Sequence, residues 1–303
     1  MLDNVSKKQE LCGEGKILQV FEKAYAKINL VLDVLAKRDD GFHEVRMIMQ
    51  TIDLADDINI KKSKYRLSVM TLGEDLPDDE SNIAYRAALL MGEYAKREPD
   101  VQIVINKKIP MAAGLAGGSS DAAAVIRGLA RLWNLPEDKK SFHEIAARLG
   151  SDVPFCLHGG TALSYGRGEL VDALPECPEF GIILACPDIA VSTRWVYENF
   201  SREDVSNYPD VDSCMDGIKK QDKAIIAKSL GNVLETVTAK KNPVIDEIKN
   251  IMDKGGARAS LMSGSGPSVF GLIDDISLAE NIAREIREQT SARVWITKTR
   301  GQL

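Results

Sequence analysis

Cysteine and histidine are scarce in this chain, and neither residue occurs in a metal-binding or redox pattern. The 303 residues include five cysteines and three histidines. The cysteines are scattered and contain no C-x-x-C pair, so neither a zinc site nor a disulfide framework is indicated. We expect reduced, mostly buried thiols in a cytoplasmic protein. The cysteines are Cys12, Cys156, Cys177, Cys186 and Cys214.

Long apolar runs and an excess of basic residues are also missing. No stretch approaches the roughly 18–20 apolar residues of a membrane span. The polar segment 1–16 lacks the apolar core of a signal peptide and is expected to be a disordered extension. A net charge of −6 argues against nucleic acid or an acidic membrane as the partner, because both need a basic face. We expect a small-molecule substrate and a monomer or homodimer.

The composition is that of an ordinary globular protein, with 44% apolar residues, and the length favours two domains. We place these domains at 17–176 and 177–303, with the boundary in the proline-containing segment 173–180. Strands are predicted at 16–25, 27–35, 45–54, 65–70, 101–105, 161–165, 181–186, 268–273 and 292–298. Helices are predicted at 82–97, 121–133, 142–150, 193–199, 220–238, 243–254 and 277–289, and a mobile surface insertion at 201–217. This mixture indicates two α+β layers.

A glycine- and serine-rich segment at 109–133 is the most informative part of the chain. Gly114, Gly117 and Gly118 allow positive φ angles and a close approach of the backbone to a ligand. Free N–H groups at the start of the following helix suit a phosphate chain. The alternative is a tight strand-to-helix turn with ordinary capping. The residues suited to cap this helix are Ser119, Ser120 and Asp121.

This loop has no lysine directly after its glycines, so it is not a G-x-x-x-x-G-K-[ST] loop. Lys27, within the apolar strand AYAKINLVL, is the best candidate for the missing cation; the alternative is an exposed edge residue. Asp152, in GSDVPF, could accept a hydroxyl proton during phosphoryl transfer, or could simply occupy a turn or an N-cap. Gly264 and Ser265, in the loop 261–271, either line a ligand or make a tight connection.

Four segments resemble, in order, the motifs of the GHMP kinase family. They are AYAKINL…GFHEVRMIMQTIDL (24–54), IPMAAGLAGGSSDAA (109–123), GSDVPF (150–155) and LMSGSGPSVFG (261–271). The resemblance spans roughly residues 18–300. It implies a two-domain α+β GHMP kinase fold: an N-terminal mixed-sheet α/β domain, a C-terminal ferredoxin-like α+β domain and an active-site cleft between them. It also implies ATP-dependent phosphorylation of an alcohol, with Mg²⁺.

The A-K-I-N-L, R-x-D-G-[FY]-H and G-S/A-D-V-P motifs together resemble one branch of this family. Its members phosphorylate the 2-hydroxyl of a polyol that carries cytidine diphosphate, on the non-mevalonate route to isoprenoid precursors. The alternatives are a sibling kinase acting on mevalonate, homoserine or a sugar, a catalytically silent sensor, and a nucleic-acid-binding protein. The sensor would be expected to lack Lys27 or Asp152, and both are present.

The resemblance also implies roles for individual residues. Asp152 matches the catalytic aspartate and Lys27 its partner lysine, and Asn29 shares the strand face of Lys27. The resemblance also places Ser119 or Ser120 near the metal. The ATP-phosphate loop comprises Pro110, Met111, Ala112, Ala113, Gly114, Leu115, Ala116, Gly117, Gly118, Ser119 and Ser120.

The cytidine end of the substrate falls on the turn that contains Phe42 and His43, with Tyr197 as a second aromatic ring. Stacking on an aromatic side chain contributes roughly 1–3 kcal/mol per base. For His43 the alternative is a turn histidine that caps backbone groups, and for Tyr197 a core aromatic. The resemblance also makes Gly264 and Ser265 substrate-binding candidates. Arg167, in the turn YGRGE, is either a phosphate ligand or an ordinary turn arginine.

Overall fold

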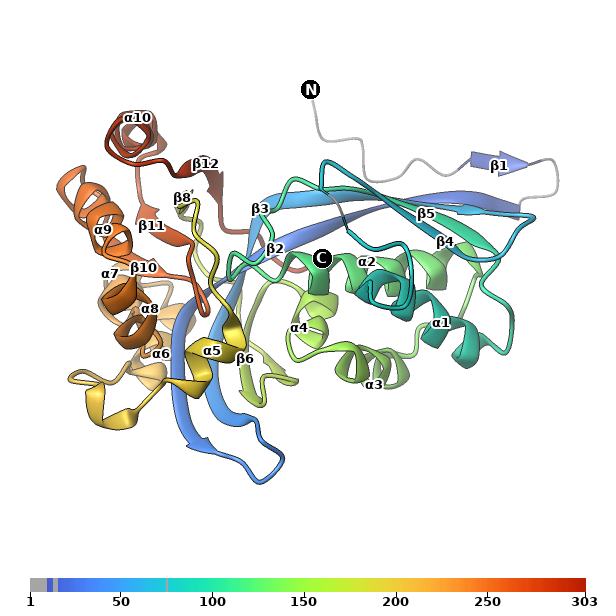
Figure 1. Ribbon diagram of the computed structural model, residues 1–303, viewed down its shortest axis with the longest axis horizontal. Helices are drawn as coiled ribbons and strands as arrows, with labels where there is room; N and C mark the ends of the chain where they lie inside the picture. The colour runs from blue at the N-terminus through green and yellow to red at the C-terminus, as the bar shows by residue number, and fades with distance from the viewer. Residues whose placement is uncertain (1–9, 13–15, 75) are drawn as a thin grey trace. The chain divides into compact units, whose positions relative to one another are not determined.

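The computed structural model describes residues 10–12, 16–74 and 76–303, and it divides into two compact units (Figure 1). Unit 1 comprises residues up to 26, 54–109 and 116–157; unit 2 comprises 27–53, 110–115 and 158–303. Two long strands, β2 (Lys16–Lys37) and β3 (His43–Lys62), contribute residues to both. The strands predicted at 16–25 and 27–35 are therefore one strand, because no glycine or proline interrupts this β-rich stretch.

In unit 1, a mixed sheet has the strand order β1-β2-β3-β5-β4 and carries helices on one face (Figure 1). The further strands are β1 (Glu10–Cys12), β4 (Ser68–Leu72) and β5 (Val101–Asn106). The helices are α1 (Ile83–Ala95), α2 (Gly117–Leu132), α3 (Lys139–Leu149) and α4 (Val153–His158). Strand β5 runs parallel to β4 and antiparallel to β3. A Cβ on Gly128 of α2 would lie 2.5 Å from Ile60 Cδ1, so this helix lies close against the sheet.

In unit 2, the remaining parts of β2 and β3 pair with other, shorter strands. Strand β3 pairs with β6 (Thr161–Gly166), β6 pairs with β7 (Leu170–Ala173), and β2 pairs in parallel with β9 (Gly231–Asn232). A separate antiparallel sheet has the order β10-β11-β8-β12. Its strands are β8 (Gly181–Cys186), β10 (Ala259–Met262), β11 (Val269–Ile273) and β12 (Arg293–Lys298).

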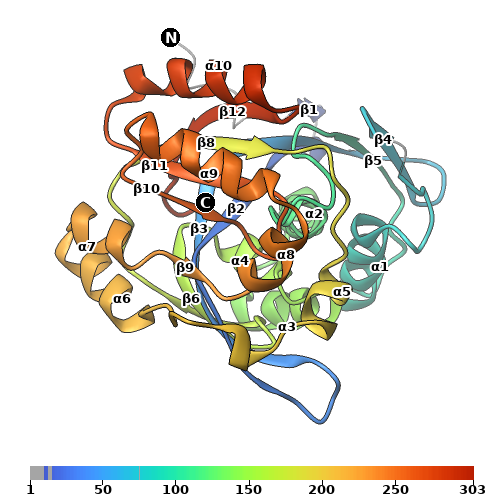
Figure 2. The same ribbon diagram turned by 60° about the vertical axis from the view of Figure 1, so that its left-hand side comes forward.

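Helices α9 (Val244–Lys254) and α10 (Ala279–Gln289) cover one face of this second sheet (Figure 2). The order β8-α9-β10-β11-α10-β12 is a ferredoxin-like arrangement. In α10, Ile282, Ala283 and Ile286 are buried, as the helical spacing of apolar residues predicts.

The remaining elements of unit 2 correct two predictions. They are α5 (Thr193–Glu198), η1 (Arg202–Asp204), α6 (Val211–Lys220), α7 (Lys223–Lys228), α8 (Glu235–Lys241) and η2 (Ile276–Leu278). The insertion predicted at 201–217 is instead structured, because Val211 and Cys214 bury one face of α6. The single helix predicted at 220–238 is wrong. Asp222 caps a new helix, α7, and Gly231 starts strand β9.

The two domains predicted at 17–176 and 177–303 stay a prediction. The segment 173–180, predicted as their boundary, lies inside unit 2. Most of the predicted extension 1–16 lies outside the described residues; within it, Glu10–Cys12 form β1 and Lys16 begins β2. Among the helices of residues 16–74 and 76–303, none is both long enough and apolar enough to cross a membrane.

Candidate active site

In unit 2, the loop 261–271 packs directly against the first part of the glycine-rich loop. A Cβ on Gly114 would lie 2.1 Å from the carbonyl oxygen of Ser263, and its φ is +75°. Gly264 has a φ of +58°, and a Cβ there would lie 3.1 Å from the carbonyl oxygen of Gly114. The Ser263 hydroxyl donates a hydrogen bond to that same carbonyl at 3.1 Å. The two backbones meet with no room for a side chain, so Gly114 is required by this contact.

Lys27 is buried beside this junction and is not an exposed edge residue. The residue is 4% exposed, and its Nζ donates to Asn29 Oδ1 at 2.7 Å. A Cβ on Gly264 would lie 3.4 Å from Lys27 Nζ. The Lys27 backbone N–H donates to the carbonyl of Leu115 at 3.2 Å, and that of Asn29 to Ser263 Oγ at 3.3 Å. Strand β2 therefore carries a positioned ammonium group to the place where the two glycine loops meet.

In unit 1, helix α2 begins without a side-chain cap. Its N-cap is Ala116, with a φ of 56°, and the methyl side chain of this residue cannot accept a hydrogen bond from the first amides. The prediction that Ser119, Ser120 or Asp121 caps this helix is wrong, because the helix starts at Gly117 and these residues lie inside its first turns. The N-cap residue therefore supplies no side-chain acceptor to the first amides, which lie at the positive end of a 16-residue helix.

Alanine occupies the left-handed region at two positions of this loop, where glycine is the usual residue. Ala112 has a φ of 49° and Ala116 a φ of 56°. A left-handed conformation costs a non-glycine residue roughly 1–2 kcal/mol. The rest of the fold must hold the loop in this conformation against that cost. Strained backbone conformations of this kind are common in ligand-binding segments.

Asp152 lies in unit 1, at the start of α4, and α4 packs against the first turn of α2. The Asp152 carbonyl accepts a hydrogen bond from the Cys156 N–H at 3.0 Å. Cys156 Sγ lies 3.3 Å from the hydroxyl of Ser120, which is buried and donates to the carbonyl of Tyr25 at 2.6 Å. Asp152 itself is half-buried. Unit 1 therefore places the predicted base directly before a helix, α4, that touches the predicted phosphate loop.

The residues predicted to hold cytidine gather in unit 2. Phe42 is 49% exposed, and the Arg167 guanidinium carbon lies 4.9 Å from the centre of its ring. The rings of His43 and Tyr197 are 5.2 Å apart and tilted by 34°. Burial, together with the positive charge of Lys37, lowers the pKa of His43, which favours the neutral imidazole with one donor and one acceptor nitrogen.

Helix α5 connects the aromatic rings of this group to the second glycine-rich loop, residues 261–271. Near its start, Thr193 Oγ1 lies 2.8 Å from Ser265 Oγ, and Tyr197 follows one turn later. The carbonyl of Ser265 accepts a hydrogen bond from Thr238 Oγ1 at 3.1 Å. Tyr197 contacts His43 from a short helix that the loop holds in place, and it is not a fully buried core residue.

One buried cation in unit 1 was missed in the sequence. A Cβ on Gly117 would lie 3.3 Å from Nζ of Lys107, which is ion-paired with Asp56 and Asp121. In the G-x-x-x-x-G-K-[ST] pattern the lysine follows the glycines, whereas Lys107 precedes them, just after β5. Two adjacent lysines, Lys107 and Lys108, between a buried strand and the loop are the signal that could have revealed it.

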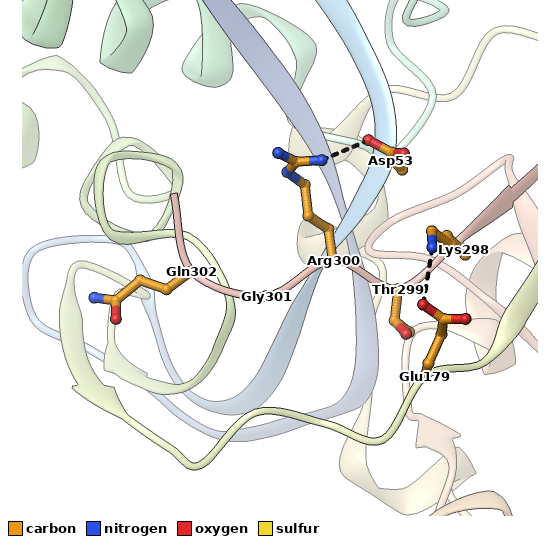
Figure 3. A pocket seen from close by; sticks show the side chains of 7 residues that line it. All are labelled: Asp53, Glu179, Lys298, Thr299, Arg300, Gly301 and Gln302. Carbon is orange, nitrogen blue, oxygen red and sulfur yellow. Dashed lines mark hydrogen bonds and ion pairs between the residues drawn. The ribbon is translucent and has the colours of Figure 1, made fainter. Parts of the chain in front are cut away.

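One cavity of unit 2 is lined by other residues. It has a volume of about 270 Å³ and contains none of the predicted site residues (Figure 3). Ion pairs join Arg300 to Asp53 at 2.9 Å and Lys298 to Glu179 at 2.8 Å (Figure 3). Its lining residues are Asp53, Glu179, Lys298, Thr299, Arg300, Gly301 and Gln302. Because its charges are paired with one another, we assign it no ligand.

Comparison with known proteins identifies the class of fold. The family models for the GHMP kinases N terminal domain and the GHMP kinases C terminal match residues 82–160 and 214–292. A solved homoserine kinase from Cytophaga hutchinsonii, 19% identical, shares the fold with a TM-score of 0.74, covering 97% of this chain and 98% of that chain. The fold is that of a GHMP kinase, which confirms the predicted fold class.

Closer relatives define the branch. A 4-diphosphocytidyl-2-C-methyl-D-erythritol kinase of Geobacillus thermodenitrificans is 50% identical over 88% of this chain and 92% of its own length. The enzyme of that name from Acetivibrio thermocellus is 49% identical, over 91% and 98%. A crystal structure of a 4-(cytidine 5'-diphospho)-2C-methyl-D-erythritol kinase superposes with a TM-score of 0.79 at 32% identity, covering 93% of this chain and all of that one. The chain belongs to the 4-diphosphocytidyl-2-C-methyl-D-erythritol kinase family, and it is an ATP-dependent small-molecule kinase.

Proposed function

We propose that the protein transfers the γ-phosphoryl group of ATP to the 2-hydroxyl of 4-diphosphocytidyl-2-C-methyl-D-erythritol, giving the 2-phosphate and ADP. This reaction lies on the non-mevalonate route to isoprenoid precursors. The observation that carries the proposal is the buried ammonium group of Lys27 at the junction of the two glycine loops. A long cationic side chain at such a site is costly unless its charge is used. The names of the relatives supply the substrate.

In this proposal, Asp152 accepts the proton of the attacking hydroxyl and Lys27 stabilises the developing alkoxide. Phosphoryl transfer asks little covalent chemistry of a protein, and alignment and charge stabilisation dominate it. Asn29 holds Lys27 Nζ through a hydrogen bond of 2.7 Å, which restricts the ammonium to one place. A general base typically contributes a factor of about 10²–10⁴.

The ATP phosphates are proposed to bind along the loop 110–120, at the uncapped start of α2. Free amides and the helix dipole favour the negative charge there. Mg²⁺, when bound, neutralises phosphate charge, and a serine hydroxyl is a suitable oxygen donor for it. Ser119 is the better of the two predicted serines, because Ser120 is buried and Ser119 is partly exposed. In the described part of the chain, no group of three or more His, Cys, Asp or Glu could hold a metal ion.

The cytidine group is proposed to bind at Phe42, His43 and Tyr197. The half-exposed ring of Phe42 offers a face for stacking, and a neutral His43 can hydrogen-bond the edge of the base. Gly264 and Ser265 line the adjoining part of the substrate site, held to α5 through Thr193. We place the reaction in the cytoplasm, since Cys156, Cys177, Cys186 and Cys214 are free thiols. A monomer or homodimer stays a prediction.

A substrate panel tests the proposed function. We expect ATP-dependent ADP release, followed in a coupled assay, with the cytidine-bearing polyol. Mevalonate, homoserine and simple sugars should give rates at least about 100-fold lower, because stacking and base hydrogen bonds are lost. Faster turnover of any of these other alcohols would move the protein to a sibling activity.

Removing the stacking face should change substrate affinity more than turnover. We expect Phe42→Ala to raise KM for the cytidine substrate about 5–50-fold, while kcat and KM for ATP change little. Phe42→Tyr should keep the wild-type KM, because the ring is retained. Tyr65→Ala removes an aromatic ring that is 82% exposed and serves as the control. If Phe42→Ala leaves KM unchanged, the base is recognised elsewhere.

A further inference from the structure

Three charged side chains of unit 1 are buried together and have no part in the chemistry proposed above. They are Asp56 on β3, Lys107 just after β5 and Asp121 on α2, and their side chains are at most 3% exposed. Burying charges is unfavourable unless they are paired and their hydrogen bonds are satisfied. A buried cluster of this kind often holds particular backbone segments in place, and its contacts show which segments these are.

The cluster joins the start of the first glycine loop to its end. Lys107 Nζ donates to Asp56 Oδ2 at 2.5 Å and to Asp121 Oδ2 at 2.7 Å. The other oxygen of Asp56 accepts from the backbone N–H groups of Lys108 and Ile109, at 2.5 and 2.8 Å. Asp56 thus holds the chain just before the loop, and Lys107 ties that point to the second turn of α2.

Lys107 is placed to act on the loop and not on a ligand directly. Its side chain is 3% exposed, and two carboxylates surround its ammonium group. A Cβ on Gly117 would lie 3.3 Å from its Nζ, so any side chain there would press on the cluster. The two carboxylates raise the pKa of Lys107 against the effect of burial, and burial with the charge of Asp56 raises the pKa of Asp121. The raised pKa of Lys107 favours a charged ammonium group held between the two carboxyl groups.

We infer that Asp56, Lys107 and Asp121 form a positioning cluster that keeps both ends of the first glycine loop in the conformation that binds the nucleotide phosphates. The inference rests on the proposed function, because it assumes that this loop binds ATP. It assigns these residues no contact with the substrate. Their effect is on the geometry of the amides at the start of α2, and hence on nucleotide affinity.

Two isosteric variants and one matched control test this role. Asp121→Asn and Asp56→Asn each replace a charge-assisted hydrogen bond by a weaker one. We expect each to raise KM for ATP, and Kd for ADP measured by titration calorimetry, about tenfold, while KM for the cytidine substrate changes less than twofold. The control is Glu22→Gln, which weakens the buried ion pair of Glu22 with Arg127 and Arg131 on the same helix. It should lower the melting temperature but leave KM for ATP unchanged.

The possible outcomes distinguish a failure of the positioning role from a failure of the proposed function. Unchanged ADP affinity in both variants overturns the positioning role while the kinase assignment stands. Equal rises in both KM values, or a matching rise in Glu22→Gln, also overturn it, because they indicate general destabilisation. If circular dichroism shows that neither aspartate variant folds, the cluster serves folding and not the loop. If the wild-type protein itself fails to bind ADP, the proposed function falls and this inference with it.

Discussion

Replacing Asp152 with asparagine is expected to lower kcat by about 10³-fold and to leave KM for both substrates within about threefold. Asparagine keeps the size of the side chain but cannot accept the hydroxyl proton in the transition state. Binding of ATP and of the cytidine substrate does not depend on that proton, so only turnover should fall. The measurement is steady-state kinetics in the ADP-release assay, with binding of ADP checked by calorimetry.

A matched control and a double variant sharpen this test. Asp100→Asn makes the same change at an exposed aspartate of the same unit and should leave kcat unaltered. Lys27→Met should also reduce kcat by several orders of magnitude, since it removes the charge that stabilises the alkoxide. If both groups act on the same step, the double variant loses far less than the product of the two single losses. Near wild-type turnover of Asp152→Asn would remove the proposed base.

The second large effect is expected at Gly114. A methyl group at this residue would lie 2.1 Å from the carbonyl oxygen of Ser263, a distance at which the two loops must separate. We expect Gly114→Ala to lower the free energy of unfolding by about 3 kcal/mol, from roughly 1–2 kcal/mol of backbone strain and 1–3 kcal/mol of overpacking. The kcat/KM for ATP should fall about 100-fold, because displacement by an ångström misaligns the reacting groups.

Gly256 is a control position at which alanine adds backbone strain without a close contact between loops. Its φ of +95° is as unfavourable for alanine, but a Cβ there would meet only Leu278 Cδ1, at 3.4 Å. Gly256→Ala should therefore cost about 1 kcal/mol in urea denaturation and leave kinetics unaltered. Equal losses of stability at the two positions would show that the contact between the loops contributes nothing.

Much of the fold follows from local patterns. The apolar spacing of α1, α9 and α10 predicts each helix to within a few residues, because one face of each must be buried. The family resemblance, based on four motifs, is confirmed by relatives about 50% identical over most of the chain. Local patterns fail where short elements depend on distant partners. Strands β7 and β10 were missed, since neighbouring strands rather than their own sequences stabilise them.

In the candidate site too, motifs predict which residues are involved, whereas their burial and contacts depend on distant segments. Lys27, Asp152 and the loop 110–120 were predicted from motifs, and their roles stay predictions. The burial of Lys27 and its bond to Asn29 could not be read from the strand, where a lysine is usually exposed. The placement of Arg167 over Phe42 was equally hidden, since it joins two turns far apart in the chain.

The sequence by itself determined the family, the two glycine-rich loops and most of the regular elements, because these depend on residue type and on spacing within a few turns. Only the tertiary structure decided where helix α2 begins, that the Gly114 and Ser263 backbones touch, and that Asp56, Lys107 and Asp121 share one buried cluster. These features arise from contacts between segments distant in sequence. Whether a charge is buried or paired depends on what the rest of the chain places next to it.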